Sequence, residues 1–237
     1  MLWGYFLAGF AILHWVVMVV LMVVSRSPRV GAQRAIRHHV RGFWSLFGAL
    51  APRLAPDREQ TRALERIRGS VVVANHLSFL DPLLLIATLG LPSTLVRRDF
   101  FRVPIFGPIL RACGYMEAGG AEGPTWLADL AAQLADGGNV FLFPEGTRSR
   151  DGQLGRFRRG AFHVTRQLGV RLEVVRIDGT DSVFPPQSPV LRLTRASRIR
   201  LLHVASLSAT DVRAFPDAAA LAKHVRALLE QARDPRC

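Results

Sequence analysis

Residues 71–82 read VVVANHLSFLDP, and this stretch predicts a buried strand, a tight turn and the start of a helix. The β-branched run Val71–Ala74 suits a strand that is buried on both faces. Asp81 before Pro82 is typical of a helix start, with the aspartate as N-cap and the proline at the first helical position. His76 therefore follows a strand directly and precedes a helix.

Strands alternate with helices over the chain from residue 57 onward. Further strands are expected at Thr94–Val96, Asn139–Phe143, Leu172–Ile177 and Ile199–Val204. Helices are expected at Pro82–Leu89, Pro104–Ala112, Pro124–Ala135, Gly160–Gln167 and Asp217–Ala232. This alternation predicts an α/β domain over residues 57–237, built on a mixed, largely parallel sheet that is flanked by helices.

The spacing of His76 and Asp81 decides how the two side chains could meet. On a straight helix, residues five apart differ by about 140° and share no face, so these two would meet only across a turn. In that geometry the carboxylate can accept the imidazole N–H, and the other ring nitrogen is free to act as a general base. The alternative is structural, with Asp81 a plain N-cap and His76 a polar surface residue.

A second candidate site, Phe143–Ser149, reads FPEGTRS and follows another predicted strand. Gly146 allows close approach of the backbone, Thr147 offers a hydroxyl, and the guanidinium of Arg148 matches phosphate oxygens. The alternative is a plain tight turn with solvated arginines. Three more arginines come before the next predicted helix, whose N-terminus favours anions: Arg156, Arg158 and Arg159.

Residues 1–24 contain no charged side chain. As a helix they would span about 36 Å, enough for a bilayer core of about 30 Å, and Trp3 and Tyr5 suit its interface. A signal peptide would carry its positive charge before the apolar run, and a core helix is rarely apolar all round. We therefore expect a hydrophobic membrane-anchor helix, as one span or a shallow hairpin, with the rest of the chain on the cytoplasmic side of the cell (inner) membrane. Five arginines follow the apolar run: Arg26, Arg29, Arg34, Arg37 and Arg41.

Residues 25–56 form a basic segment without any Asp or Glu. Within it, residues 42–52 are uncharged and carry Phe43, Trp44 and Phe47. This stretch is too short to span a bilayer, but it suits a helix in the headgroup region. An ordinary helix packed on the domain fits equally well, so both interpretations stay open.

Composition excludes several classes of protein. Cys113 and Cys237 are the two cysteines, too few for a disulfide scaffold or a four-cysteine zinc site. His38 and His39 lie in a basic flank, and His163, His203 and His224 lack acidic neighbours at ligand spacing, so no metal site is expected. The net charge of +13 is the one hint of nucleic acid, and six of those charges precede Asp57, where a membrane surface explains them. Thiol catalysis is not expected either, because Cys113 lies in an apolar stretch.

The two candidate sites, in this order and at this separation, resemble the glycerolipid acyltransferase family, whose type member acylates 1-acylglycerol-3-phosphate. Asn75, His76 and Asp81 match the family's Asn-His-x-x-x-x-Asp block. Phe143–Ser149 matches its Phe-Pro-Glu-Gly-Thr-Arg-Ser block at all seven positions. Ile177–Thr180 is similar to the end of its fourth block. The likeness covers about half of the chain.

The resemblance implies a membrane-bound enzyme that moves a fatty acyl group from an acyl thioester to a hydroxyl of a lysophospholipid, with 1-acylglycerol-3-phosphate as the expected acceptor and phosphatidic acid as product. The thioester would be acyl-coenzyme A or acyl carrier protein. The partners would thus be the donor and a membrane lipid, with no cofactor and no covalent enzyme intermediate. His76 would deprotonate the hydroxyl, and Asp81 would orient His76. The residues implied in substrate binding are Glu145, Gly146, Thr147, Arg148 and Arg97, with Arg156 and Arg158 as further anion-binding candidates.

Two departures leave the acceptor open. The family's second block usually ends in a pair containing an arginine, whereas Gly114–Gly120 contains none. Its fourth block usually carries a proline where this chain reads Val174-Val175-Arg176. The alternatives are therefore an acyltransferase for another lysolipid, or a non-catalytic, membrane-anchored lipid-binding protein.

Overall fold

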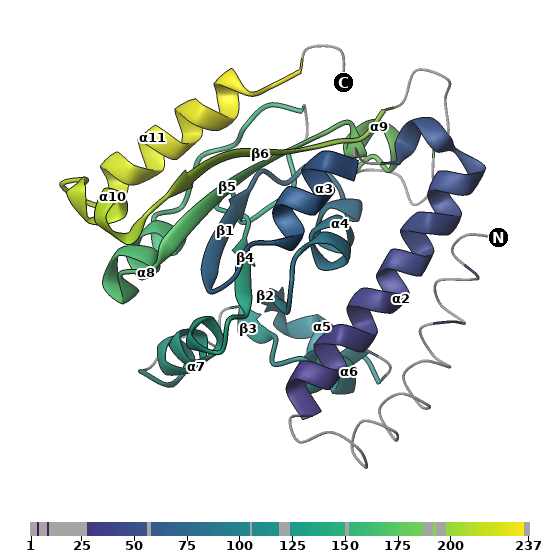
Figure 1. Ribbon diagram of the computed structural model, residues 1–237, viewed down its shortest axis with the longest axis horizontal. Helices are drawn as coiled ribbons and strands as arrows, with labels where there is room; N and C mark the ends of the chain where they lie inside the picture. Colours follow the sequence, from purple (N-terminus) through teal and green to yellow (C-terminus); the bar gives the residue numbers. More distant parts are fainter. Residues whose placement is uncertain are drawn as a thin grey trace.

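The computed structural model describes residues 28–55, 58–104, 106–118, 124–149, 152–186, 192 and 198–234, together with Gly4 and Gly9. Its centre is a six-stranded sheet in the order β3-β2-β4-β1-β5-β6 (Figure 1). Parallel pairing joins the first five strands of that order, and β6 is antiparallel to β5. The predicted mixed, largely parallel α/β fold is therefore confirmed. The strands are β1 (Ser70–Ala74), β2 (Pro92–Arg97), β3 (Met116–Ala118), β4 (Asn139–Leu142), β5 (Arg171–Asp178) and β6 (Arg200–Leu207).

The central strands are buried along their whole length. Every residue of β1 and of β4 is buried. A parallel strand covered on both faces reads as a continuous apolar run, which is why Val71–Ala74 was recognisable in the sequence. Val71 and Val72 of β1 lie opposite Val140 and Phe141 of β4. Strand β1 therefore sits in the middle of the fold, and its end reaches the middle of one sheet edge.

Helices cover both faces of the sheet (Figure 1). One hydrophobic cluster joins the sheet to the first group of helices, and a second cluster lies between the sheet and the second group. The first group is α2 (Pro28–Leu50), α3 (Arg58–Glu65), α4 (Leu80–Thr88), α5 (Arg98–Arg102) and α6 (Phe106–Ala112). The second group is α7 (Pro124–Ala135), α8 (Gly160–Leu168), α10 (Ala209–Ala214) and α11 (Ala218–Gln231). Two short helices, η1 (Pro52–Leu54) and α9 (Thr180–Val183), complete the described elements.

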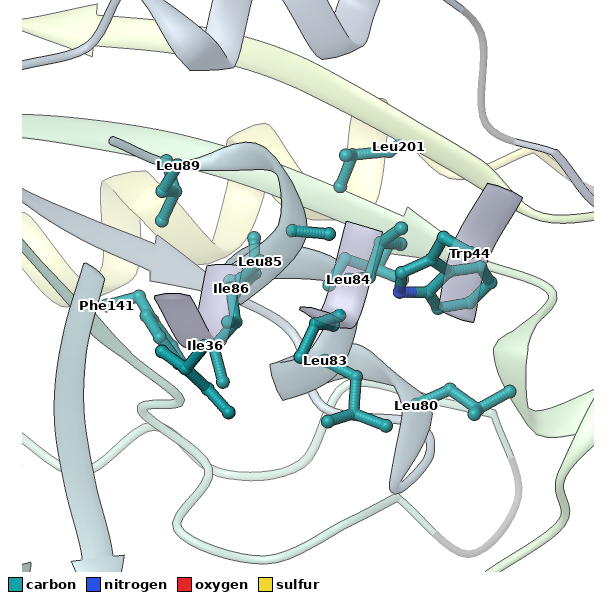
Figure 2. Close-up of a cluster of buried hydrophobic side chains, with 14 of the residues drawn as sticks. Ile36, Trp44, Leu80, Leu83, Leu84, Leu85, Ile86, Leu89, Phe141 and Leu201 are labelled. Carbon is teal, nitrogen blue, oxygen red and sulfur yellow. The ribbon is translucent and has the colours of Figure 1, made fainter. Parts of the chain in front are cut away.

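Helix α2 packs on the domain through its aromatic side chains. Phe43 and Phe47 are fully buried. The rings of Trp44 and Phe47 meet edge to face, with their centroids 5.3 Å apart. Figure 2 shows Trp44 in the same cluster as Leu83 and Leu84 of α4. Two interpretations of residues 42–52 were open, a helix in the headgroup region and a helix packed on the domain. The structure shows the aromatic side chains packed on the domain. The division of the chain at residue 57 stays a prediction.

Two arginines of α2 form ion pairs with α3. Arg37 and Arg41 reach the same carboxylate oxygen of Glu65, at 3.3 and 2.7 Å. Glu65 is the last residue of α3, so these pairs join the basic segment to the element that precedes β1. Both pairs are partly exposed, and such pairs contribute about 1 kcal/mol or less to stability.

The predicted membrane anchor, residues 1–24, lies outside the described residues apart from Gly4 and Gly9. It therefore stays a prediction. Of the helices that the structure describes, none combines the length and the apolar character needed to cross a membrane.

Several predicted boundaries change. The prediction that Asp81 is an N-cap is wrong: α4 begins at Leu80, and Asp81 lies in its first turn. The helix expected from Pro104 begins at Phe106 and is preceded by α5, which was not expected. Strand β3 was also missed, because Met116–Ala118 shows no β-branched run and becomes a strand by pairing beside β2.

Candidate active site

The carboxyl ends of the parallel strands bring the two candidate sites together at one edge of the sheet. His76 follows the end of β1, and Phe143–Ser149 follows the end of the neighbouring strand β4. The segment after β5, on the other side of β1, begins α9 (Figure 1). Ligands of open α/β sheets commonly bind outside the carboxyl ends of strands. The sheet order therefore assembles a candidate site from segments far apart in the sequence.

His76 and Asp81 meet across the turn between β1 and α4. The distance from His76 Nδ1 to Asp81 Oδ2 is 2.9 Å. The same Oδ2 accepts the backbone N–H groups of Leu77 and Ser78, at 2.6 and 2.7 Å. Asp81 is fully buried, whereas 18% of the His76 side chain is exposed. An Nδ1–H donated to the carboxylate leaves Nε2 with its lone pair, facing away from the carboxylate.

The carboxylate of Asp81 has a further partner that sequence reasoning missed. Thr180, the first residue of α9, donates its hydroxyl to Asp81 Oδ1 at 2.5 Å. Both side chains are fully buried. The sequence signal for Thr180 was its place at the end of the Ile177–Thr180 segment, and no role was expected of its hydroxyl.

Asn75 joins β1 to β5 beyond the last paired residues. Its amide nitrogen donates to the carbonyl of Ile177 at 2.7 Å, and its amide oxygen accepts the N–H of Ile177 at 2.8 Å. Both of these hydrogen bonds are buried. Asn75 therefore fixes the start of the His76 turn relative to β5, and it does not face the open side of the site.

The loop after β4 fixes His76 from the other side. The ring of Phe143 stacks on the imidazole with centroids 4.1 Å apart and planes 17° apart. The N–H of Ser149 donates to the carbonyl of His76 at 2.8 Å. The imidazole is thus held by a hydrogen bond at one nitrogen and by an aromatic face, while no described residue forms a hydrogen bond with Nε2.

Glu145 is a buried residue of this loop, with 6% of its surface exposed. Its Oε1 accepts the backbone N–H of His76 at 3.0 Å, and its Oε2 accepts the N–H of Gly155 at 2.8 Å. Glu145 was expected to help position the acceptor. Its two oxygens instead accept hydrogen bonds from backbone N–H groups. A contact between Glu145 and substrate stays a prediction.

Gly146, Thr147 and Arg148 lie on the surface of the loop. Gly146 has a φ of +70°, a left-handed conformation that favours glycine. A Cβ there would lie 2.8 Å from Nε of Arg158, an exposed and flexible side chain that can move aside. Arg148 forms no hydrogen bond or ion pair with any other residue that the structure describes. A guanidinium without a partner among the described residues is available to an anion.

The other predicted cationic residues are also exposed. Arg156 and Arg158 lie at the surface before α8. Arg97 ends β2 at the same edge of the sheet, and its guanidinium pairs with Asp99 at 2.6 Å, both side chains being largely exposed. Their contacts with substrate stay predictions.

Arg176, at the fourth-block departure, has structural partners. Arg176 is 2% exposed, and its Nε donates to Asp178 Oδ1 at 2.6 Å. Burial raises the pKa of the Asp178 carboxyl, and the neighbouring guanidinium offsets part of that shift. Of residues 114–120, the structure describes the part that ends at Ala118. At the fourth-block departure, Arg176 thus forms a buried ion pair with Asp178 of the same strand, β5. Its Nη1 also donates to the carbonyl of Leu229 in α11, at 3.4 Å.

The thiol of Cys113 and the imidazole of His203 have structural surroundings that explain them without a catalytic role. Cys113 is buried, and burial raises the pKa of its thiol to about 12. His203 Nε2 lies 2.8 Å from the buried carboxylate of Glu173, which also accepts the hydroxyl of Ser206. Within the described parts of the chain, no group of three or more His, Cys, Asp or Glu side chains could hold a metal ion.

A protein-family model described as Acyltransferase matches residues 57–178, about half of the chain. The chain belongs to this acyltransferase family. The matched region contains His76 and Asp81 as well as the whole Phe143–Ser149 loop. It ends at Asp178, two residues before Thr180.

Curated proteins similar to this acyltransferase-family chain come from bacteria and chloroplasts. A chloroplastic 1-acyl-sn-glycerol-3-phosphate acyltransferase of Brassica napus is 29% identical over 73% of this chain and 52% of its own length. A chloroplastic relative of the same name from Arabidopsis thaliana is 34% identical over 50% of this chain and 34% of its own length. The chain thus spans about half or less of these two relatives. A 1-acyl-sn-glycerol-3-phosphate acyltransferase of Salmonella typhimurium is 28% identical over 81% of this chain and 79% of that protein.

A solved structure extends the likeness of fold. The crystal structure of a 1-acyl-sn-glycerophosphate (LPA) acyltransferase from Thermotoga maritima matches with a TM-score of 0.75 and 18% sequence identity. The match covers 98% of this chain and 96% of that one. The two chains therefore share an overall fold.

Proposed function

We propose that this chain transfers a fatty acyl group from an acyl thioester to the free hydroxyl of 1-acylglycerol-3-phosphate, with His76 as the general base. One observation carries the proposal. The imidazole of His76, fixed at Nδ1 by the buried Asp81, lies against the loop that carries Arg148, whose guanidinium has no hydrogen bond or ion pair with another described residue. A base and a phosphate-binding group on one sheet edge match an acceptor that has a hydroxyl and a phosphate on one glycerol.

In the proposed reaction, Nε2 of His76 removes the proton of the acceptor hydroxyl. The hydroxyl oxygen attacks the carbonyl carbon of the thioester, forming a C–O bond. The C–S bond then breaks, and the departing thiolate takes up the proton held on the imidazole. General base catalysis by a positioned histidine contributes about 100-fold to 10,000-fold to such a step.

Asp81 serves the reaction through His76. Its carboxylate accepts the Nδ1 proton, which selects the tautomer with Nε2 free and stabilises the imidazolium after proton transfer. Because Asp81 is fully buried, this interaction is poorly screened by water. The two amide donors at Oδ2 keep the carboxylate turned toward His76.

Arg148 is proposed to hold the acceptor phosphate, with Thr147 and the backbone at Gly146 beside it. All three lie on the surface of the loop, so a headgroup could reach them directly. Arg156 and Arg158 would add positive charge around the phosphate and the anionic donor. Arg97 is a further candidate, although its guanidinium already pairs with Asp99.

The membrane is proposed as the place of the reaction, because the acceptor is a lipid. The uncharged residues 1–24 would anchor the chain in the cell (inner) membrane, and the arginines that follow would keep the acyltransferase domain on the cytoplasmic side. There the domain would meet acyl-coenzyme A or acyl carrier protein as its donor.

The proposal is tested by acyl transfer with membranes that carry the chain, compared with matched membranes that lack it. Labelled acyl-coenzyme A and acyl-carrier-protein donors are each offered with 1-acylglycerol-3-phosphate, 1-acylglycerol and 1-acylglycerophosphocholine. The expected result is labelled phosphatidic acid, formed only when the chain is present. Preference for another lysolipid would correct the acceptor, and transfer to none of them would favour the non-catalytic, lipid-binding alternative.

A further inference from the structure

Thr180 contacts the dyad from an element that lies far away in the sequence. It is the first residue of α9 and is fully buried. Its hydroxyl donates to Asp81 Oδ1 at 2.5 Å, across a separation of 99 residues. Neither candidate site in the sequence includes it.

The two oxygens of Asp81 are held very differently. Oδ2 accepts from three groups, which are the imidazole of His76 and the N–H groups of Leu77 and Ser78. Among the described residues, Oδ1 accepts from Thr180 alone. Because Asp81 is fully buried, removal of the Thr180 hydroxyl would leave a buried, charged acceptor without its partner.

The backbone places Thr180 without the help of its own hydroxyl. Asn75 is hydrogen-bonded twice to Ile177 before α9, and the hydroxyl of Ser78 donates to the carbonyl of Phe184 after it, at 2.7 Å. Gly179, with a φ of +79°, turns the chain from β5 into the short helix. These contacts hold the segment on both sides of Thr180, so loss of the hydroxyl acts first on Asp81.

We propose that Thr180 is a positioning residue for the acyl transfer inferred above: its hydroxyl fixes the plane of the Asp81 carboxylate so that Oδ2, and not Oδ1, faces Nδ1 of His76. Without the Thr180 hydroxyl, the donors at Oδ2 alone would resist rotation of the carboxylate about its Cβ–Cγ bond. Such rotation would weaken the hydrogen bond that selects the His76 tautomer. The proposal rests on the proposed function, because the step that it serves is proton removal by His76.

The test compares Thr180→Val, which keeps the shape and removes the hydroxyl, with Thr180→Ser, which keeps the hydroxyl. Thr180→Val should lower kcat about tenfold or more, the loss expected for one hydrogen bond to a charged group. Both KM values should stay within about twofold, because Thr180 is buried away from the exposed loop. Thr180→Ser should restore most of kcat.

Thr165→Val is the matched control. Thr165 is also fully buried, and its hydroxyl donates to the carbonyl of Ala161 within α8, at 2.7 Å. This variant loses a buried threonine hydroxyl on the other face of the sheet, so it measures the general cost of that loss. Its kcat per folded molecule should match that of the wild type.

A second readout separates this proposal from the function on which it rests. The proton that His76 Nδ1 shares with Asp81 is expected to give a far-downfield NMR resonance in the solubilised full chain, and His76→Ala should assign it by its disappearance. Thr180→Val should shift or broaden this resonance, and Thr165→Val should leave it unchanged. If the wild type transfers no acyl group, the proposed function fails and the resonance still decides the role of Thr180. An unaltered resonance together with an unchanged kcat in Thr180→Val would overturn the proposal, as would equal kcat losses in Thr180→Val and Thr165→Val.

Discussion

The buried side chains of the candidate site differ from the exposed ones in whether they form hydrogen bonds with the chain itself. Asp81 and Glu145 are buried, and both oxygens of each carboxylate accept hydrogen bonds from the chain. Thr147 and Arg148, two and three residues after Glu145, are exposed, and neither forms a hydrogen bond or ion pair with another described residue. The same loop therefore contains both kinds of residue.

This difference suggests a division of labour. The buried carboxylates fix the backbone and the imidazole before any substrate arrives, which lowers the reorganisation needed at the moment of proton transfer. The exposed side chains are left for a ligand that brings its own negative charge. Changes beneath the site should therefore lower kcat, and changes on its surface should raise KM.

Glu145→Gln should give the largest effect in this comparison. An amide supplies one acceptor oxygen, so its NH₂ group would face the N–H of either His76 or Gly155. The expected result is a loss of kcat of about tenfold or more and a fall in the free energy of unfolding of about 1.5–3 kcal/mol. Steady-state kinetics and denaturant unfolding measure the two quantities.

Glu173→Gln is the control for Glu145→Gln. Glu173 is 2% exposed and accepts hydrogen bonds from His203 and Ser206, away from the carboxyl ends of the parallel strands. The Glu173→Gln substitution should lower the free energy of unfolding but leave kcat per folded molecule near the wild-type value. If both variants lose kcat equally, Glu145 has no special connection with His76.

Arg148→Ala should have a smaller effect that depends on the acceptor. Loss of a charge-assisted contact with phosphate should raise KM for 1-acylglycerol-3-phosphate about tenfold. The KM for an acceptor without phosphate, such as 1-acylglycerol, should not change. Arg66→Ala is a suitable control, because Arg66 is exposed just before β1, at the opposite edge of the sheet. Equal losses with both acceptors would contradict phosphate binding by Arg148.

Cys113→Ala should have the smallest effect. The thiol is buried, and its pKa of about 12 keeps it protonated at neutral pH. We expect less than a twofold change in acyl transfer, and slow labelling of Cys113 by thiol reagents until the chain unfolds. Complete loss of transfer in this variant, with the fold retained, would point to thiol chemistry instead.

The strands were predictable from the sequence where residues are apolar on both faces, as in Val71–Ala74 and Asn139–Leu142. Met116–Ala118 was not, because its place beside β2 comes from tertiary pairing and not from local pattern. The helix start at Asp81 was misplaced for a related reason. Its carboxylate turns back to the amides of Leu77 and Ser78, where an N-cap would turn forward into the helix.

The contact between His76 and Asp81 was predictable, because the two residues are five apart across a strand–turn–helix. The hydrogen bond between Glu145 and His76 and the one from Thr180 to Asp81 were not, because these pairs are separated by 69 and 99 residues along the chain. Residue type and spacing therefore identified the reacting groups. The long-range contacts that orient those groups follow from the order of the strands in the sheet.

The most direct test of the central claim is acyl transfer to 1-acylglycerol-3-phosphate by the wild type and by His76→Ala. The two proteins are compared at equal amounts in the membrane and with equal thermal stability. The account predicts that the variant loses about 100-fold or more of kcat, since it lacks the general base. A variant that transfers acyl groups at close to the wild-type rate would contradict the assignment of His76 and Asp81 as the catalytic dyad.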